Sequence, residues 1–358
     1  MDTECSQGEA LRLREGKEVS DEQTRKHVVS LLGTRSFFVQ YAYAGLEPGK
    51  SQVKAYTWFR YTAKAEPGEF TRLDASYFGL ERGYLRWEHA FTDKIKSRVN
   101  VDLFSSDKDL HGAGLKLKYG YVDFKGIIPE GKITVGLQKS YWGTIYDWKY
   151  VTIEKALEDK EKVIASADYG VTANANIVGG MGEWQLGIYN GEGYKKCKSK
   201  VDKYPAFVGN IRFIPVPGLT IGGSALYEKK EESQRLLMAS VGRIARGPID
   251  IWGEIITTKT GNPEVTGLGV MIMPILKLNR KLELVGRADY WDKDTDIEKN
   301  AHYRAIAGFN YHFIKRKKGK PGVMLQVNLE RKQYEDPDKK ADNELLVQLR
   351  WEFATNSF

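Results

Sequence analysis

The sequence of 358 residues has few cysteines and prolines and contains no long apolar run. The two cysteines, Cys5 and Cys197, lie far apart in the sequence, so they do not indicate a disulfide framework. No stretch of about eighteen apolar residues occurs, which excludes a transmembrane helix but not a membrane barrel. Met1–Glu18 lacks the apolar core of a secretion signal, and we expect that a leader has been removed from a mature chain.

The net charge of +8 comes from acids and bases that are spread over the whole chain. A nucleic-acid-binding protein would carry a basic stripe instead, so we expect no nucleic-acid partner. Glycine (36) and tyrosine (20) are frequent, and the mean hydropathy is −0.47. A polar average with many aromatic residues is typical of a barrel whose strands are apolar on one face only.

Apolar and polar residues alternate with a period of two along most of the chain, which is the signature of strands. In Gln52–Lys64, for example, Phe59 and Tyr61 share one face, and Lys54 and Arg60 share the other. The alternation predicts sixteen strands: Gln52–Lys64, Phe78–Phe91, Ile95–Leu103, Ala113–Phe124, Lys132–Gln138, Asp168–Val178, Glu183–Tyr189, Tyr204–Ile214, Leu219–Glu228, Arg235–Arg243, Ile249–Thr257, Val265–Pro274, Leu282–Trp291, His302–Phe313, Gly322–Arg331 and Glu344–Phe353.

Tight turns rich in glycine or proline alternate with long charged loops between these strands. Short turns at one end and long loops at the other are typical of outer-membrane barrels. We therefore predict an all-β fold, a transmembrane antiparallel β-barrel of about sixteen strands, over residues 51–358. Residues 1–50 are predicted to be a separate polar N-terminal segment, with a short helix at Ser20–Leu32 and an extra strand at Ser36–Ala44.

Ser140–Ala167 differs from the rest of the chain. It opens with an aromatic cluster that includes Tyr141, Trp142 and Trp148, and its apolar residues from Ile153 onward recur at helical spacing. A segment of this length within a strand-rich chain is usually functional or disordered, and its apolar content argues against disorder. We predict a loop that folds inward and narrows a pore.

The strand faces opposite the apolar ones are predominantly basic in the first four strands. Aromatic residues near strand ends, Tyr119 and Tyr121 among them, are predicted to form belts at the lipid interfaces. The candidate pore-lining bases are Lys54, Arg60, Arg82, Arg86, Lys96, Arg98, Lys116 and Lys118, and the loop acids Asp147 and Glu154 are expected to oppose them. Such a wall favours anions, or alternatively its charges only keep the pore wet.

Several stretches resemble the phosphate-selective porin family of Gram-negative outer membranes. They are Arg82-Gly-Tyr-Leu with Phe91-Thr-Asp-Lys and Arg98-Val-Asn-Val-Asp-Leu, Tyr119-Gly-Tyr-Val-Asp-Phe, Val135-Gly-Leu-Gln with Tyr141-Trp142, and Ser166-Ala-Asp-Tyr-Gly-Val with Gly187-Ile-Tyr-Asn-Gly-Glu-Gly-Tyr. The resemblance implies a homotrimeric outer-membrane porin in contact with lipid and lipopolysaccharide. It also implies that the third long loop constricts a passage for small ions and solutes.

Phosphate specificity does not follow from the loop composition. Ser140–Ala167 carries five acids against four lysines, whereas the resemblance implies a ladder of arginines and a cluster of lysines at the constriction of a phosphate-selective member. We therefore predict a general-diffusion porin with a modest anion preference.

No catalytic, metal or cofactor motif emerges from the sequence. The five histidines have no ligand-like spacing, and no Ser–His pair can be assembled. Asp292–Asp296 begins like a calcium loop, yet Ile297 stands where that loop requires glycine, so we interpret it as a solvated acidic loop with a weak cation site as the alternative. The alternative functions are a secreted or periplasmic carbohydrate-binding β-protein and an outer-membrane barrel enzyme.

Overall fold

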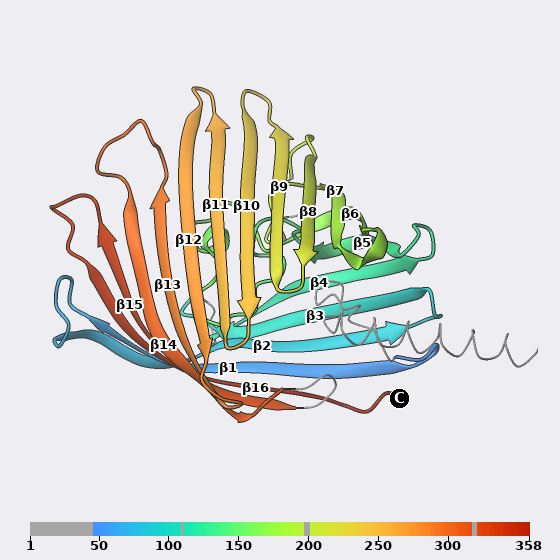
Figure 1. The fold of residues 1–358 in the computed structure, drawn as a ribbon, viewed down its shortest axis with the longest axis horizontal. Coiled ribbons are helices and arrows are strands. Elements are labelled where there is room, and N and C mark those ends of the chain that lie inside the picture. Colours follow the sequence, from blue (N-terminus) through green and yellow to red (C-terminus); the bar gives the residue numbers. More distant parts are fainter. Residues whose placement is uncertain (1–45, 109–110, 197–200, 317–320) are drawn as a thin grey trace, which may run out of the picture. The chain divides into compact units, whose positions relative to one another are not determined.

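The computed structural model describes residues 46–108, 111–196, 201–316 and 321–358. Within them the chain forms a closed antiparallel sheet in which sequential strands pair and β16 returns to β1 (Figure 1). The predicted sixteen-stranded barrel is confirmed, and each predicted strand has a counterpart. The strands are β1 (Ser51–Ala65), β2 (Leu73–Ala90), β3 (Ile95–Ser105), β4 (Ala113–Lys125), β5 (Gly131–Lys139), β6 (Ala167–Asn176), β7 (Gly182–Tyr189), β8 (Ala206–Val216), β9 (Leu219–Lys229), β10 (Gln234–Arg246), β11 (Ile249–Gly261), β12 (Val265–Lys277), β13 (Leu282–Asp292), β14 (His302–Ile314), β15 (Gly322–Tyr334) and β16 (Asp342–Ala354).

The period-two pattern sorts side chains between the two faces of the closed sheet. In β3, Val99 and Leu103 are exposed on the outside, whereas Arg98 and Asn100 are buried on the inside. In β11, Ile255 is likewise exposed. Because successive strand residues point to opposite faces, the sequence builds an apolar outer surface and a largely polar inner one.

The tightest turns and the longest loops lie at opposite ends of the strands, although the β9–β10 and β11–β12 connections at the loop end are also short. Two-residue turns join β8 to β9 and β10 to β11, where Gly218 and Gly247 have φ values of 88° and 58°. At Gly218 a Cβ atom would come within 2.3 Å of the carbonyl oxygen of Ala245, so this turn requires glycine. The longest connection, residues 140–166, leaves β5 at the other end.

A β-bulge in β4 changes which side chains face inward. The pairing of β3 with β4 shifts register after Asn100, and Lys118 becomes an extra residue of β4. Alternation restarts after such a bulge. Tyr119 therefore lines an inner cavity, and the guanidinium of Arg98 lies 5.5 Å from the ring of Tyr121. The prediction that these two tyrosines belong to a lipid-facing belt is wrong for this reason.

Helix is scarce in the part of the chain that the structure describes. It comprises α2 (Leu157–Lys160) and the 3-10 turn η1 (Val178–Gly180). The helical spacing of the apolar residues from Ile153 onward suggests a longer helix than the single turn that forms. Strand side chains bind much of this backbone instead of an intrahelical partner. No described helix is long and apolar enough to cross a bilayer. The helix and extra strand predicted within residues 1–45 lie outside the described residues.

The outward orientation of Ile255 at the middle of β11 gives a stability prediction. Ile255→Arg should lower the free energy of unfolding in lipid vesicles by about 2–4 kcal/mol, because an arginine near the bilayer midplane loses its hydration. Ile249→Arg, at the turn end of the same strand, is the matched control and should cost about 0–1 kcal/mol. Denaturant titration of both variants measures the difference, and equal costs would contradict the placement of β11 across a bilayer.

Candidate functional site

The connection between β5 and β6, residues 140–166, packs against the inner face of the sheet, and we call it the inner segment. Its side chains Trp142, Ile153 and Leu157 are almost completely buried. Trp142 and Leu157 join an apolar core with inward residues of β8 to β13, such as Ile256 and Met271. Each such burial contributes about 1.5–3 kcal/mol. The segment thus covers the apolar part of the inner wall.

Polar side chains of the strands bind the backbone of the inner segment. Because the segment forms so little helix, its N–H and C=O groups need other partners. Strand side chains supply them: Ser224 to the N–H of Gly143 (3.0 Å), Glu254 to the N–H of Thr144 (2.7 Å), Asn328 to the N–H of Ile153 (2.7 Å), Gln326 to the carbonyl of Tyr150 (3.0 Å) and Arg287 to the carbonyl of Lys155 (2.6 Å). These contacts fix the segment along β9, β11, β13 and β15.

Two carboxylates, Glu158 of the inner segment and Glu254 of β11, meet at Thr144. The Oγ1 atom of Thr144 lies 2.9 Å from Glu254 and 3.3 Å from Glu158, and the N–H of Ile145 donates to Glu158 at 2.5 Å. Burial, and then the neighbouring carboxylate of Glu254, raise the pKa of Glu158. The protonated form of Glu158 is therefore the one that fits this site.

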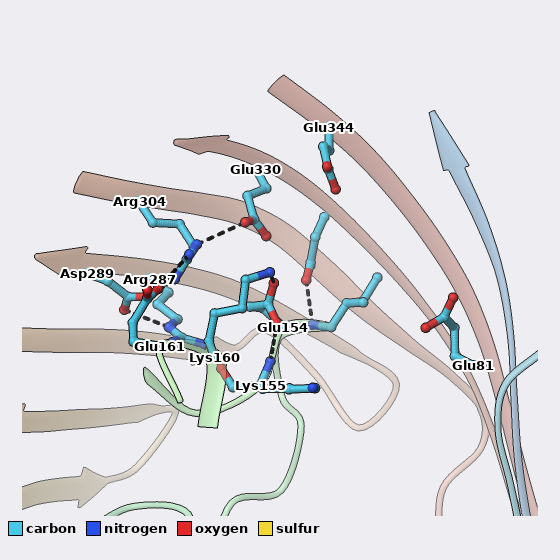
Figure 2. A network of polar contacts seen from close by, with 12 residues as sticks. Glu81, Glu154, Lys155, Lys160, Glu161, Arg287, Asp289, Arg304, Glu330 and Glu344 are labelled. Carbon is cyan, nitrogen blue, oxygen red and sulfur yellow. Dashed lines mark hydrogen bonds and ion pairs between the residues drawn. The ribbon is translucent and has the colours of Figure 1, made fainter. Parts of the chain in front are cut away.

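Ion pairs hold the inner segment around α2. The guanidinium of Arg304 contacts Glu161 (2.9 Å), Glu330 (3.0 Å) and Asp289 (3.2 Å), as Figure 2 shows. Burial disfavours the charge of Glu161, but the hydrogen bond to His302 and the charge of Arg304 lower its pKa to about 2. The segment is thus anchored to β14 by charge as well as by packing, and Asp289 and Glu330 hold Arg304 in place from β13 and β15.

An inner cavity of about 520 Å³ lies between the inner segment and a wall that includes β1, β2, β4 and β16. Three of the predicted pore-lining bases, Arg82, Arg86 and Lys118, line it. Lys118 donates a hydrogen bond to Ser166 at the end of the inner segment.

The other predicted bases do not line this cavity and have local partners. Lys54 and Arg98 both form salt bridges with Glu88, at 2.5 and 2.6 Å, and Lys116 lies 3.3 Å from Asp102. The remaining two contact Glu81 (3.2 Å, from Arg60) and the carbonyl oxygen of Leu46 (3.2 Å, from Lys96). Nearby acids therefore offset much of the charge of this wall.

Neither of the two predicted loop acids lines the cavity. Asp147 is partly buried, and its Oδ1 atom accepts no hydrogen bond from a described residue. Glu154 forms an ion pair with Lys160 within the inner segment (Figure 2). The loop acid that does line the cavity is Asp159.

The predicted pore-lining set does not include Arg350, Lys139 and Tyr150, which all line the cavity. Arg350 pairs in register with Trp58 because β16 closes against β1. The predicted closure of the barrel could therefore have placed Arg350 beside the first strand. Tyr150 has a φ of 52°, and its carbonyl accepts a hydrogen bond from Arg350 at 2.8 Å. No local sequence pattern predicts a left-handed tyrosine.

One group of carboxylates within the described ranges lies close enough together to share a cation: Glu192, Asp202 and Glu228. The ammonium of Lys230 already lies among them, at 3.7, 3.5 and 3.3 Å. A metal ion would have to displace this lysine. The run Asp292–Asp296 forms turns in which carboxylates accept backbone N–H groups two residues further on, at 3.0 and 3.2 Å.

The raised pKa of Glu158 predicts a pH dependence of the inner segment. Its contribution to stability is fully present below about pH 4.5, the ordinary pKa of glutamate, and is lost as the pH rises through the raised value. Between acidic and alkaline buffer, the amides of Thr144 and Ile145 should lose protection from hydrogen exchange. Glu158→Gln, which cannot ionise, should remove this loss, and an identical pH response in the variant would contradict the assignment.

No family model and no curated protein matches the chain. Solved structures do match it. The outer membrane channel DcaP of Acinetobacter baumannii is 13% identical with a TM-score of 0.60, over 86% of this chain and 98% of that one. The anion-selective porin from Comamonas acidovorans is 12% identical with a TM-score of 0.57, over 85% and 99%.

The trimer form of OmpT, an outer membrane protein of Vibrio cholerae, is also 12% identical with a TM-score of 0.57, over 85% and 99% of the two chains. At these identities the likeness concerns the fold alone. The chain therefore shares its barrel fold with outer-membrane porins.

Proposed function

We propose that the protein is an outer-membrane porin of a Gram-negative bacterium, a water-filled channel for passive diffusion of ions and small solutes. The closed sheet leaves no edge strand, and its outer face exposes large apolar side chains such as Phe78, Leu115 and Leu329 to the surrounding lipid. A soluble carbohydrate-binding protein would have no use for such a face. In this proposal residues 51–358 are the channel and residues 1–50 a separate segment.

The observation that carries the transport proposal is the charge of the inner cavity. Arg82, Lys118, Lys139 and Arg350 line it, and none of them forms a salt bridge with a described residue. Two of the lining acids already have cationic partners, Glu352 in Arg316 at 2.8 Å and Glu283 in Lys315 at 3.7 Å. Asp159 remains against four cations, and such a surplus raises the local concentration of anions.

The inner segment is the constriction of this proposed channel. It is bound to β9, β11, β13 and β15, and the cavity with its cations lies beside it, so in this proposal solutes pass on the side of the cavity. The similar structures include a channel and an anion-selective porin, which support the transport proposal. One is a trimer form, and we also propose a homotrimer in contact with lipid and lipopolysaccharide. We propose a general channel with a modest anion preference and no cofactor or hydrolytic activity.

Planar-bilayer recording tests this function. The purified protein should give stepwise conductance, and the reversal potential in a salt gradient should show anion preference. Lys118→Gln combined with Lys139→Gln should move the reversal potential toward that of a cation-selective pore, since two unpaired charges leave the cavity. The preference should weaken at high salt, because the Debye length falls to about 3 Å at 1 M.

Lys259→Gln is the control, since Lys259 lies outside the cavity and pairs with Glu264 at 2.9 Å. It should leave the reversal potential where it is in the wild type. Cation preference in the wild type would contradict the anion-channel proposal, and so would a double variant that behaves like this control. Hydrolysis of lipid or peptide without any conductance would favour an enzyme.

A further inference from the structure

Aromatic rings hold the guanidinium of Arg82 at the cavity wall. Its Cζ atom lies 4.1 Å from the ring centroid of Trp58, 4.6 Å from that of Tyr84 and 4.8 Å from that of Tyr150. The hydroxyl of Tyr150 accepts a hydrogen bond from one of its nitrogens at 3.2 Å. Stacking of this kind already restricts the arginine side chain before a solute binds. Binding therefore costs less conformational entropy than it would for a free side chain.

This clamped guanidinium still has donors to offer. The Nε atom of Arg82 is buried and has no hydrogen-bond partner, and no described acid forms a salt bridge with this arginine. A buried donor without an acceptor is costly, and a buried cation more so. The planar fork of an arginine matches the two oxygens of a carboxylate. Because Arg82 lines the cavity and no described acid pairs with it, an anionic solute in the cavity would supply the missing counter-charge.

A second arginine completes a row across three neighbouring strands. In the sheet, Trp58 pairs in register with Arg82 on one side and with Arg350 on the other. Arg350 lies 4.7 Å from the ring of Trp58, and it donates hydrogen bonds to the carbonyl of Tyr150 and to Gln326 at 2.8 and 3.3 Å. Two guanidinium groups thus flank one indole, and neither forms a salt bridge with a described residue.

The rest of the cavity is largely apolar. Aromatic and aliphatic side chains line it alongside the cations, among them Tyr119, Trp148, Val151 and Met324. Its volume of about 520 Å³ lies within the range of roughly 300–1,000 Å³ that is typical of small-molecule sites. Chloride or inorganic phosphate gains nothing from apolar walls, whereas an organic anion with a flat apolar body contacts both kinds of surface.

We propose that the row Arg82–Trp58–Arg350 is a binding subsite for small aromatic carboxylates on their way through the channel. The carboxylate binds at the guanidinium of Arg82, on the side that lines the cavity, with Arg350 nearby, and the ring lies against the aromatic side chains of the cavity. This inference rests on the proposed channel function and names a class of solute for it.

The test uses the chloride conductance of the full-length protein in planar bilayers, with benzoate, acetate and inorganic phosphate as probes. Benzoate should reduce the current at lower concentration than acetate or phosphate. Arg82→Gln should weaken the block by benzoate about tenfold or more, the effect of losing a hydrogen-bonded charge. Trp58→Leu should weaken the block by benzoate more than that by acetate, because it removes an aromatic surface and also loosens the two guanidinium groups that bind either carboxylate.

Arg243→Gln is the matched control, because Arg243 also stacks on an indole, 4.6 Å from Trp252, but forms a two-pronged salt bridge with Asp250 (2.8 and 2.7 Å) and lies outside the cavity. It should keep the benzoate block of the wild type. Arg82→Lys provides a second variant that retains the charge, and it should weaken the block because an ammonium lacks the planar fork.

The outcomes separate this subsite from the channel function. Absence of any conductance would sink the channel proposal itself. Conductance that benzoate blocks no better than acetate or phosphate in the wild type would overturn the subsite and leave the channel intact. The subsite would also fall if Arg243→Gln weakened the benzoate block as much as the Arg82 variants.

Discussion

The inner segment determines which part of the barrel interior is covered. The inner faces of β8 to β13 carry apolar side chains, such as Ile256 and Met273, that are buried only because the segment packs on them. Its own backbone, with almost no helix, finds partners in the polar side chains of the same wall. Neither surface is stable without the other, so the segment and the covered wall form one unit.

Because the inner segment covers only one side of the interior, the cationic side chains on the two sides have different partners. On the covered side, cations are matched with acids, as Arg304 is with Asp289, Glu161 and Glu330. On the side that remains open, Arg82 and Arg350 rest on aromatic rings, and neither forms a salt bridge with an acid in the part of the chain that the structure describes. Aromatic faces stabilise a cation without neutralising it. The cavity is therefore positively charged because aromatic rings, and not acids, are the partners of these two arginines.

Most of the fold could be predicted from the sequence, because every strand of a closed sheet shows the same alternation of outward and inward side chains. Alternation with a period of two located all sixteen strands. The bulge at Lys118 could not be predicted, since its cause is the pairing of β3 with β4. The candidate site was predicted in part: Arg82, Arg86 and Lys118 line the cavity, but Tyr150 lies there through long-range contacts with β15 and β16 that leave no local trace.

A cross-link between the inner segment and the wall that it covers tests this account most directly. The N–H of Ile153 lies 2.7 Å from the side chain of Asn328 on β15. With Cys5 and Cys197 replaced by serine, the thiols of Ile153→Cys and Asn328→Cys should be joined by a short bifunctional methanethiosulfonate reagent, and conductance should be the same before and after reduction. Failure to cross-link in the folded barrel, or a conductance that changes on reduction, would contradict the placement of the inner segment against β15.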